Sequence, residues 1–168
     1  GRVRAQDFGP QLITGSMNRS LLPTASPTRM IPRLEAVLRG DLTQTNPGLN
    51  SDWETISTVG RNLRWGITVR DRNQNNPNGV GFVAQDEMTV SVSDDAGPFV
   101  VRSQNSTSVL WKAGANELIE WDVALTDRAP INTQTVSIYL SVDGGQTFPH
   151  LLIENTLNDG EVYVVVPG

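Results

Sequence analysis

Apolar and polar residues alternate along much of the chain beyond residue 60, with the period of two that is typical of a β-strand with one buried face. In residues 63–71, leucine, tryptophan, isoleucine and valine alternate with arginine, glycine and threonine. Residues 87–93 repeat the pattern through methionine and valine, and the polar residues 72–79 separate the two runs. The pattern predicts two neighbouring antiparallel strands joined by a long loop.

A break at residues 94–98, with the sequence DDAGP, separates this pair from a second series of apolar runs. Each run is short and is bounded by glycine, proline, asparagine or aspartate; the runs are residues 99–102, 108–111, 118–123, 136–142, 150–154 and 162–166. Short strands at this spacing are typical of a β-sandwich. We therefore expect an all-β chain of two tandem antiparallel β-sandwich modules, residues 1–95 and residues 96–168.

Residues 1–33 lack a sustained period, and the chain reads as β from Trp53 onward. Prolines at positions 10, 23, 27 and 32 favour extended chain over helix. Residues 34–38 (LEAVL) are the one helix-like stretch, and Gly40 follows closely, so we expect a helix of about one and a half turns. Residues 43–52 read as a loop because they are rich in asparagine, glycine and proline.

Composition narrows the classes of protein to which the chain could belong. The 168 residues carry a formal net charge of −5, which disfavours a nucleic-acid partner because phosphate contacts need clustered lysine and arginine. The longest apolar runs are too short to span a bilayer. Cysteine is absent, which excludes disulfides and thiolate chemistry. The polar N-terminus does not resemble a signal peptide, so we expect a mature or excised piece of a protein.

Residues 141–148 (SVDGGQTF) fit the pattern S-x-D-x-G-x-T-[FW], which resembles the Asp-box of sialidases. A propeller needs several blades, whereas this chain has one copy of the motif and no repeat of 40–50 residues. We therefore favour a structural hairpin turn over a glycosidase motif. In it the Asp143 side chain accepts backbone N–H groups, Gly144 and Gly145 supply positive φ angles, and Phe148 covers the turn.

No residue has the setting of a catalytic group. His150 is the single histidine, which cannot make a multi-histidine zinc site, and no zinc ligand is expected. Motifs of zinc peptidases, serine hydrolases and nucleotide-binding loops are absent. The four tryptophans, at positions 53, 65, 111 and 121, favour core or junction packing over sugar stacking.

Structural calcium is the one cofactor that the sequence suggests. Oxygen ligands from aspartate and asparagine suit Ca²⁺, although such loops also form simple turns. The candidate ligands flank or lie in the long loop, or sit at the expected module junction: Asp71, Asn73, Asn75, Asp86, Asp94 and Asp95.

Five stretches of the chain resemble, in the same order, a segment found downstream of the catalytic domain in secreted bacterial zinc metallopeptidases of the reprolysin-like kind. They are residues 26–38 (SPTRMIPRLEAVL), 51–71 (SDWETISTVGRNLRWGITVRD), 86–105 (DEMTVSVSDDAGPFVVRSQN), 111–152 and 158–167 (NDGEVYVVVP). The likeness covers almost the whole chain, from about residue 9 to residue 168. It implies a module like that of polycystic kidney disease proteins (PKD-like), followed by an immunoglobulin- or fibronectin-like module.

The resemblance also implies a function. The zinc-binding helix of that family has no counterpart here, so no catalytic residue is carried over, and we expect a secreted, non-catalytic accessory region. It would act as a spacer or would bind a protein substrate, a cell surface or a matrix component. Both modules lack strands that the family has, which leaves open edges. The alternative is an extracellular structural or adhesive subunit that self-associates by strand exchange through those edges, and an independent hydrolase is the weakest reading.

Overall fold

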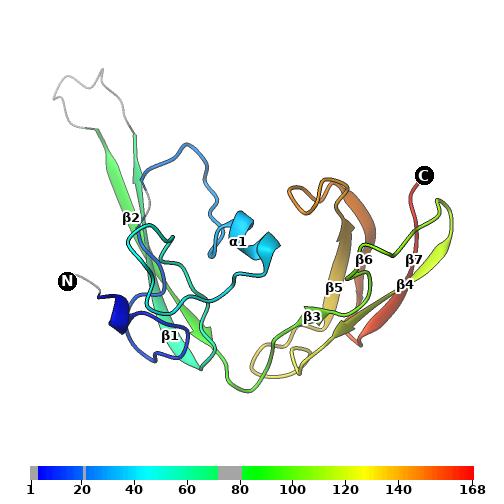
Figure 1. The fold of residues 1–168 in the computed structure, drawn as a ribbon, viewed down its shortest axis with the longest axis horizontal. Helices are drawn as coiled ribbons and strands as arrows, with labels where there is room; N and C mark the ends of the chain where they lie inside the picture. Colours follow the sequence, from blue (N-terminus) through cyan, green and yellow to red (C-terminus); the bar gives the residue numbers. More distant parts are fainter. Residues whose placement is uncertain (1–3, 21, 72–80) are drawn as a thin grey trace.

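The computed structural model describes residues 4–20, 22–71 and 81–168. Strands account for 32% of the described residues and helices for 6%, and the strand pairs among them are antiparallel, so the all-β prediction is confirmed. Figure 1 shows two groups of strands, one on each side of an extended segment around residue 97.

The first group is a two-stranded ribbon. Strand β1 (Arg61–Arg70) pairs with β2 (Val83–Val92) over ten consecutive residue pairs, from Arg61 opposite Val92 to Arg70 opposite Val83. Both strands lie where the alternating pattern places them. β2 begins four residues earlier than the run 87–93, because the ladder continues past the point at which the apolar alternation weakens.

Irregular chain takes the place of a second sheet beside this ribbon. Its only regular elements are the 3-10 turn η1 (Ala5–Asp7) and the helix α1 (Leu34–Arg39), among the residues described before position 61. The helix ends where the sequence predicts, because Gly40 adopts φ 77° and its N–H bonds back to the carbonyls of Ala36 and Val37.

A small core holds the irregular chain together. The side chains of Phe8, Met17 and Trp53 are 2%, 4% and 7% exposed, and the rings of Phe8 and Trp53 meet edge to face with centroids 5.5 Å apart. The Arg19 guanidinium lies over the Trp53 ring, 4.6 Å from its centre, and forms a cation–π pair with it. This region therefore packs about aromatic anchors and not about a second sheet.

The second group of strands forms a small sandwich. One sheet has the order β3-β4-β7, from β3 (Val100–Val101), β4 (Asn116–Asp122) and β7 (Glu161–Val165); the other pairs β5 (Thr135–Leu140) with β6 (His150–Leu157). Ile119, Trp121 and Val164 form the buried core between them, and side chains of β5 and β6 pack against it. Inward positions alternate with outward ones along β4 and β7, as expected for a sheet with one covered face.

One expected strand is absent from this group. Residues 108–111 are irregular, so the prediction of a strand there is wrong. The Ser106 hydroxyl bonds the Ser108 N–H and hydroxyl, which holds this stretch in a turn, and Leu110 is 90% exposed. Trp111 still packs against the core, so its apolar character serves packing without strand pairing.

Candidate interaction surface

The Asp-box residues build the turn between β5 and β6. The Asp143 carboxylate accepts the Thr147 hydroxyl (2.6 Å), the Thr147 N–H (2.9 Å) and the Ser141 hydroxyl (2.7 Å). These bonds, that from the Thr147 hydroxyl above all, lower the pKa of Asp143 from 3.8 to about 2. Gly144 and Gly145 have φ angles of 73° and 87°, in the region that favours glycine.

The turn is closed on itself. The Ser141 hydroxyl also accepts the Gly145 N–H at 2.7 Å, so the hydrogen-bonding groups of the motif are directed at one another. Phe148 is 54% exposed, which means that it covers the turn only in part. The turn also approaches α1 at Gly145. A side chain at this position would begin with a Cβ only 2.5 Å from a methyl group of Leu38, so the two segments are in close contact. The motif therefore brings the second strand group into contact with the helix of the first.

The candidate calcium ligands lie at separate places along the ribbon. The Asp71 carboxylate accepts the Phe82 N–H (2.7 Å) just beyond the end of β1. Asp71 lies opposite Phe82, and Asp86 follows Phe82 by four residues along the other strand. The two aspartates are therefore about 13 Å apart along the ribbon. Asp94 receives the Gly60 N–H at the opposite end of the ribbon, and the Asp95 N–H bonds to the Ser93 hydroxyl.

Calcium stays a prediction for this chain. Asn73 and Asn75 lie outside the described residues. In residues 4–20, 22–71 and 81–168, no group of three or more histidine, cysteine, aspartate or glutamate side chains is placed to hold a metal ion. The separations above mean that Asp71, Asp86 and Asp94 cannot share one ion.

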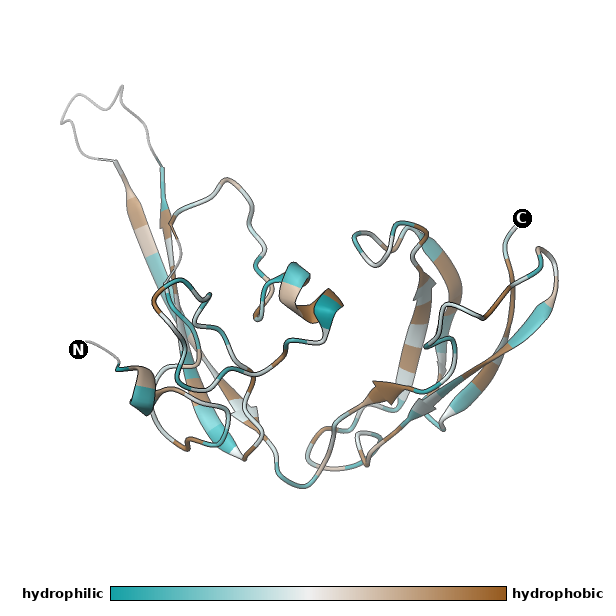
Figure 2. Ribbon diagram, viewed as in Figure 1, coloured by the Kyte–Doolittle hydropathy of each residue, from teal (hydrophilic) through white to brown (hydrophobic). Residues whose placement is uncertain are grey.

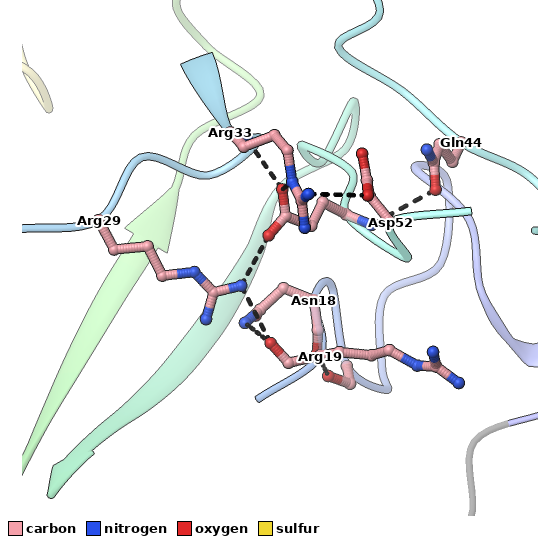
Figure 3. A network of polar contacts seen from close by, with 8 residues as sticks. Asn18, Arg19, Arg29, Arg33, Gln44 and Asp52 are labelled. Atoms are coloured by element: carbon pink, nitrogen blue, oxygen red, sulfur yellow. Dashed lines mark hydrogen bonds and ion pairs between the residues drawn. The ribbon is translucent and has the colours of Figure 1, made fainter. Parts of the chain in front are cut away.

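A buried carboxylate organises the irregular chain beside the ribbon (Figure 3). The Glu54 side chain is 1% exposed; its Oε1 pairs with Arg29 Nη2 at 2.7 Å and its Oε2 accepts the Arg33 N–H at 2.8 Å. Arg33 also pairs with Asp52 at 3.1 Å. Arg29 in turn donates to the carbonyl of Arg19 (3.0 Å). The carboxylate thus joins residues 29–33 to the chain at Glu54, and the Arg29 guanidinium adds a third segment at Arg19.

Sequence reasoning missed this cluster. Glu54 lies in a stretch without periodic pattern, and its partners precede it by 25 and 21 residues. The one signal in the sequence is the pair of arginines in the proline-rich stretch. These arginines need an anionic partner only if the stretch packs against the rest of the chain, and the sequence does not show that it does. The cluster is a structural tie, because the carboxylate is covered by the chain itself.

The ribbon carries an apolar face that is only half covered. Cross-strand partners share a face, so Leu63, Trp65, Ile67 and Val69 of β1 lie on the same side as the even-numbered residues of β2. The end of this face near Arg61 is partly buried, whereas the far end is open. We define the apolar strip as its exposed apolar members: Ile67 (58%), Val69 (59%), Phe82 (72%), Met88 (61%) and Val90 (39%). Asp86, opposite Ile67, is an exposed carboxylate on the same face. Figure 2 shows apolar segments along both strands of the ribbon, alternating with polar ones.

The opposite face of the ribbon is polar. Arg64 pairs there with Glu87, its diagonal neighbour on the other strand, and Thr68, Thr89 and Ser91 share that side. A two-stranded ribbon is of marginal stability in water when nothing covers its apolar side. The apolar strip is therefore the surface on which a partner gains most by binding.

A groove borders the covered end of the ribbon. Residues 13–18 form one wall and residues 61–65 the other, and the space between them is about 340 Å³. The Arg61 guanidinium ties the two walls together, with bonds of 2.6 Å from Nη1 to the Leu12 carbonyl and from Nη2 to the Gly15 carbonyl. The strip and the groove adjoin along β1 and together make the candidate interaction surface.

Comparison with protein-family models, with curated proteins and with solved structures finds no match for this chain. Among the described helices none is long and apolar enough to cross a membrane; α1 has 6 residues. The fold is that of an all-β protein with sandwich-like packing.

Proposed function

We propose that this chain is a non-catalytic accessory region of a secreted bacterial metallopeptidase, in which it acts as a spacer and binds a protein substrate or a surface. The order of sequence motifs described above supports the family assignment. The observation that carries the binding role is the apolar strip on the ribbon, whose members are between 39% and 72% exposed.

Coverage of the strip is the physical source of affinity. Full burial of one large aliphatic or aromatic side chain contributes about 1.5–3 kcal/mol, so five half-exposed side chains offer a gain on the order of 5 kcal/mol before the costs of association. The polar opposite face carries an ion pair and hydroxyl groups and remains in water. The ribbon therefore presents the apolar strip on one face only, and a partner needs a complementary apolar surface to bind it.

The test uses the whole chain and an unfolded protein as the probe. Immobilised chain is titrated with reduced, carboxymethylated casein by biolayer interferometry, and the same casein is followed for cleavage. The double variant Ile67→Thr/Met88→Thr should weaken binding about tenfold. Leu49→Thr is the control, because Leu49 is 90% exposed and lies outside the strip; it should change binding by less than about twofold.

Two results would contradict the proposal. Cleavage of casein by the isolated chain would show a catalytic role. Equal binding by the strip variant and the Leu49→Thr control would show that the apolar strip does not recognise protein.

A second candidate function is an extracellular structural or adhesive subunit that assembles by strand exchange. The observation that favours it is the number of open edges: within the described strands, each sheet ends in strands with one unpaired side, β1 and β2, β3 and β7, and β5 and β6. Light scattering coupled to size-exclusion chromatography, over a hundredfold range of protein concentration, should then show growing assemblies. A monomer throughout that range eliminates this candidate.

A further inference from the structure

The groove beside β1 borders the backbone of the strand. Its strand wall consists of five consecutive residues, 61–65, and not of alternate ones. Consecutive positions project to both faces of a ribbon. A space lined by all of them lies along the strand's outer edge, where main-chain groups are accessible.

The facing wall is held in place. The Arg61 guanidinium bonds the carbonyls of Leu12 and Gly15. Met17 is 4% exposed, and its carbonyl accepts the Thr55 N–H at 3.0 Å. The groove is therefore preformed, which lowers the entropy cost of filling it.

The hydrogen-bond register shows which main-chain groups face the groove. The Asp71 N–H bonds to the Phe82 carbonyl, and these two residues continue the register of the ladder. In an antiparallel ladder the direction of the N–H and C=O groups alternates. Odd-numbered residues of β1 therefore bond to β2, and residues 62, 64, 66 and 68 point their N–H and C=O groups outward. Among the described residues no hydrogen bond to these outward groups is present.

The two edges of the ribbon differ. On β2 the outward groups belong to odd-numbered residues, and the Glu87 N–H is already taken by the Asp86 carboxylate at 2.8 Å. A charged side chain folded over an edge N–H is a means of blocking strand addition. On β1 the side chains of Asn62 and Arg64 bond to side chains of β2, and among the described residues no side chain bonds to an outward N–H of the strand. The edge of β1 is thus the accessible one.

We propose that the outer edge of β1 takes up an extended peptide by strand addition, with the groove receiving one end of it. This rests on the proposed function, because the peptide is a segment of the bound protein. Alternate side chains of the peptide would extend the apolar face beside Leu63, Trp65 and Ile67. The intervening ones would lie beside Arg64 and Arg70 on the polar face, where acidic residues fit the charge of Arg70 and can share the Arg64 guanidinium with Glu87. The peptide is therefore one of alternating apolar and acidic residues.

The test measures binding of a fluorescein-labelled, eight-residue peptide of alternating valine and glutamate to the whole chain by fluorescence anisotropy. Gly66→Pro removes one outward N–H without removing a bond to β2, and it should weaken binding at least about fivefold. Gly66→Ala keeps the N–H and should stay within about twofold. A valine–lysine peptide of the same length should bind at least about tenfold more weakly.

A second measurement does not depend on the variants. Amide exchange followed by NMR on the unaltered chain should slow at residues 62, 64, 66 and 68 when the valine–glutamate peptide is added, and not at residues 85, 89 and 91 of β2. Protection of the β2 residues, or absence of the even-numbered pattern on β1, would overturn the proposal. So would protection that rises with protein concentration in the absence of peptide, which indicates a second copy as the occupant.

The two proposals fail separately. If the strip variant loses casein binding while Gly66→Pro retains it, the binding role stands and strand addition at β1 is wrong. If casein does not bind to the strip at all, the proposed function falls, whatever the short peptide does.

Discussion

Replacement of Glu54 by glutamine is the sharpest test of how the irregular chain is held. The carboxylate is 1% exposed and meets Arg29 at 2.7 Å and the Arg33 N–H at 2.8 Å. In Glu54→Gln one oxygen remains for Arg29, and an NH2 group replaces the oxygen that accepts the Arg33 N–H. The change removes a charge-assisted hydrogen bond and leaves two donors facing each other.

The magnitude follows from the burial of the partners. Breaking a fully buried ion pair costs about 3–5 kcal/mol. Arg29 is 29% exposed, so its guanidinium recovers part of its hydration when the charge of Glu54 is lost. Loss of one charge-assisted hydrogen bond accounts for about 1.5–3 kcal/mol. We therefore expect Glu54→Gln to lower the free energy of unfolding of this region by about 2–3 kcal/mol.

Urea unfolding followed by tryptophan fluorescence measures this effect, since Trp53 directly precedes Glu54 and is buried. Glu87→Gln is the matched control: Glu87 also pairs with an arginine, but both side chains are mostly exposed, at 59% and 77%. The control should cost less than about 0.5 kcal/mol. Equal losses in the two variants would refute the reasoning, because they would show that burial of Glu54 contributes nothing.

Three further predictions concern the second strand group. Asp143→Asn should destabilise the chain at pH 5, and its unfolding midpoint should converge with that of the unaltered chain as pH falls from 4 to 2, because the folded-state pKa is lowered to about 2; a constant difference contradicts this. Gly145→Ala should lower the thermal midpoint more than Gly144→Ala, since both have positive φ but only Gly145 meets a side chain of α1; equal shifts would exclude that contact. Asn158→Leu should cost about 2–4 kcal/mol in urea unfolding, because it leaves the buried Trp121 indole N–H without a partner and removes the bonds to the Thr126 hydroxyl and the Thr133 carbonyl; a loss below 1 kcal/mol argues against it.

The sequence by itself determined the local structure of the strands. The alternation in residues 63–71 and 87–93 requires one apolar and one polar face, because side chains of an extended chain alternate between faces. The short helix was equally predictable, since Gly40 follows an apolar stretch that has no proline. Strand β1 starts at Arg61 and α1 ends at Arg39, both close to the expected positions.

The sequence failed where regular structure depends on a partner. Residues 108–111 have the composition of a strand but pair with no strand, and bonds between Ser106 and Ser108 hold a turn there instead. Glu54 shows no local pattern, and its burial is decided by arginines more than 20 positions away.

Tertiary structure alone decided which parts of the apolar pattern are used inside the molecule. Ile119 and Trp121 are buried because the β5–β6 pair covers their sheet, whereas Ile67 and Met88 have the same kind of pattern and remain more than half exposed. Periodicity specifies that a face is apolar, and it contains no information about what covers that face. Coverage depends on contacts between segments distant in sequence, and in the ribbon those contacts reach only the end near Arg61.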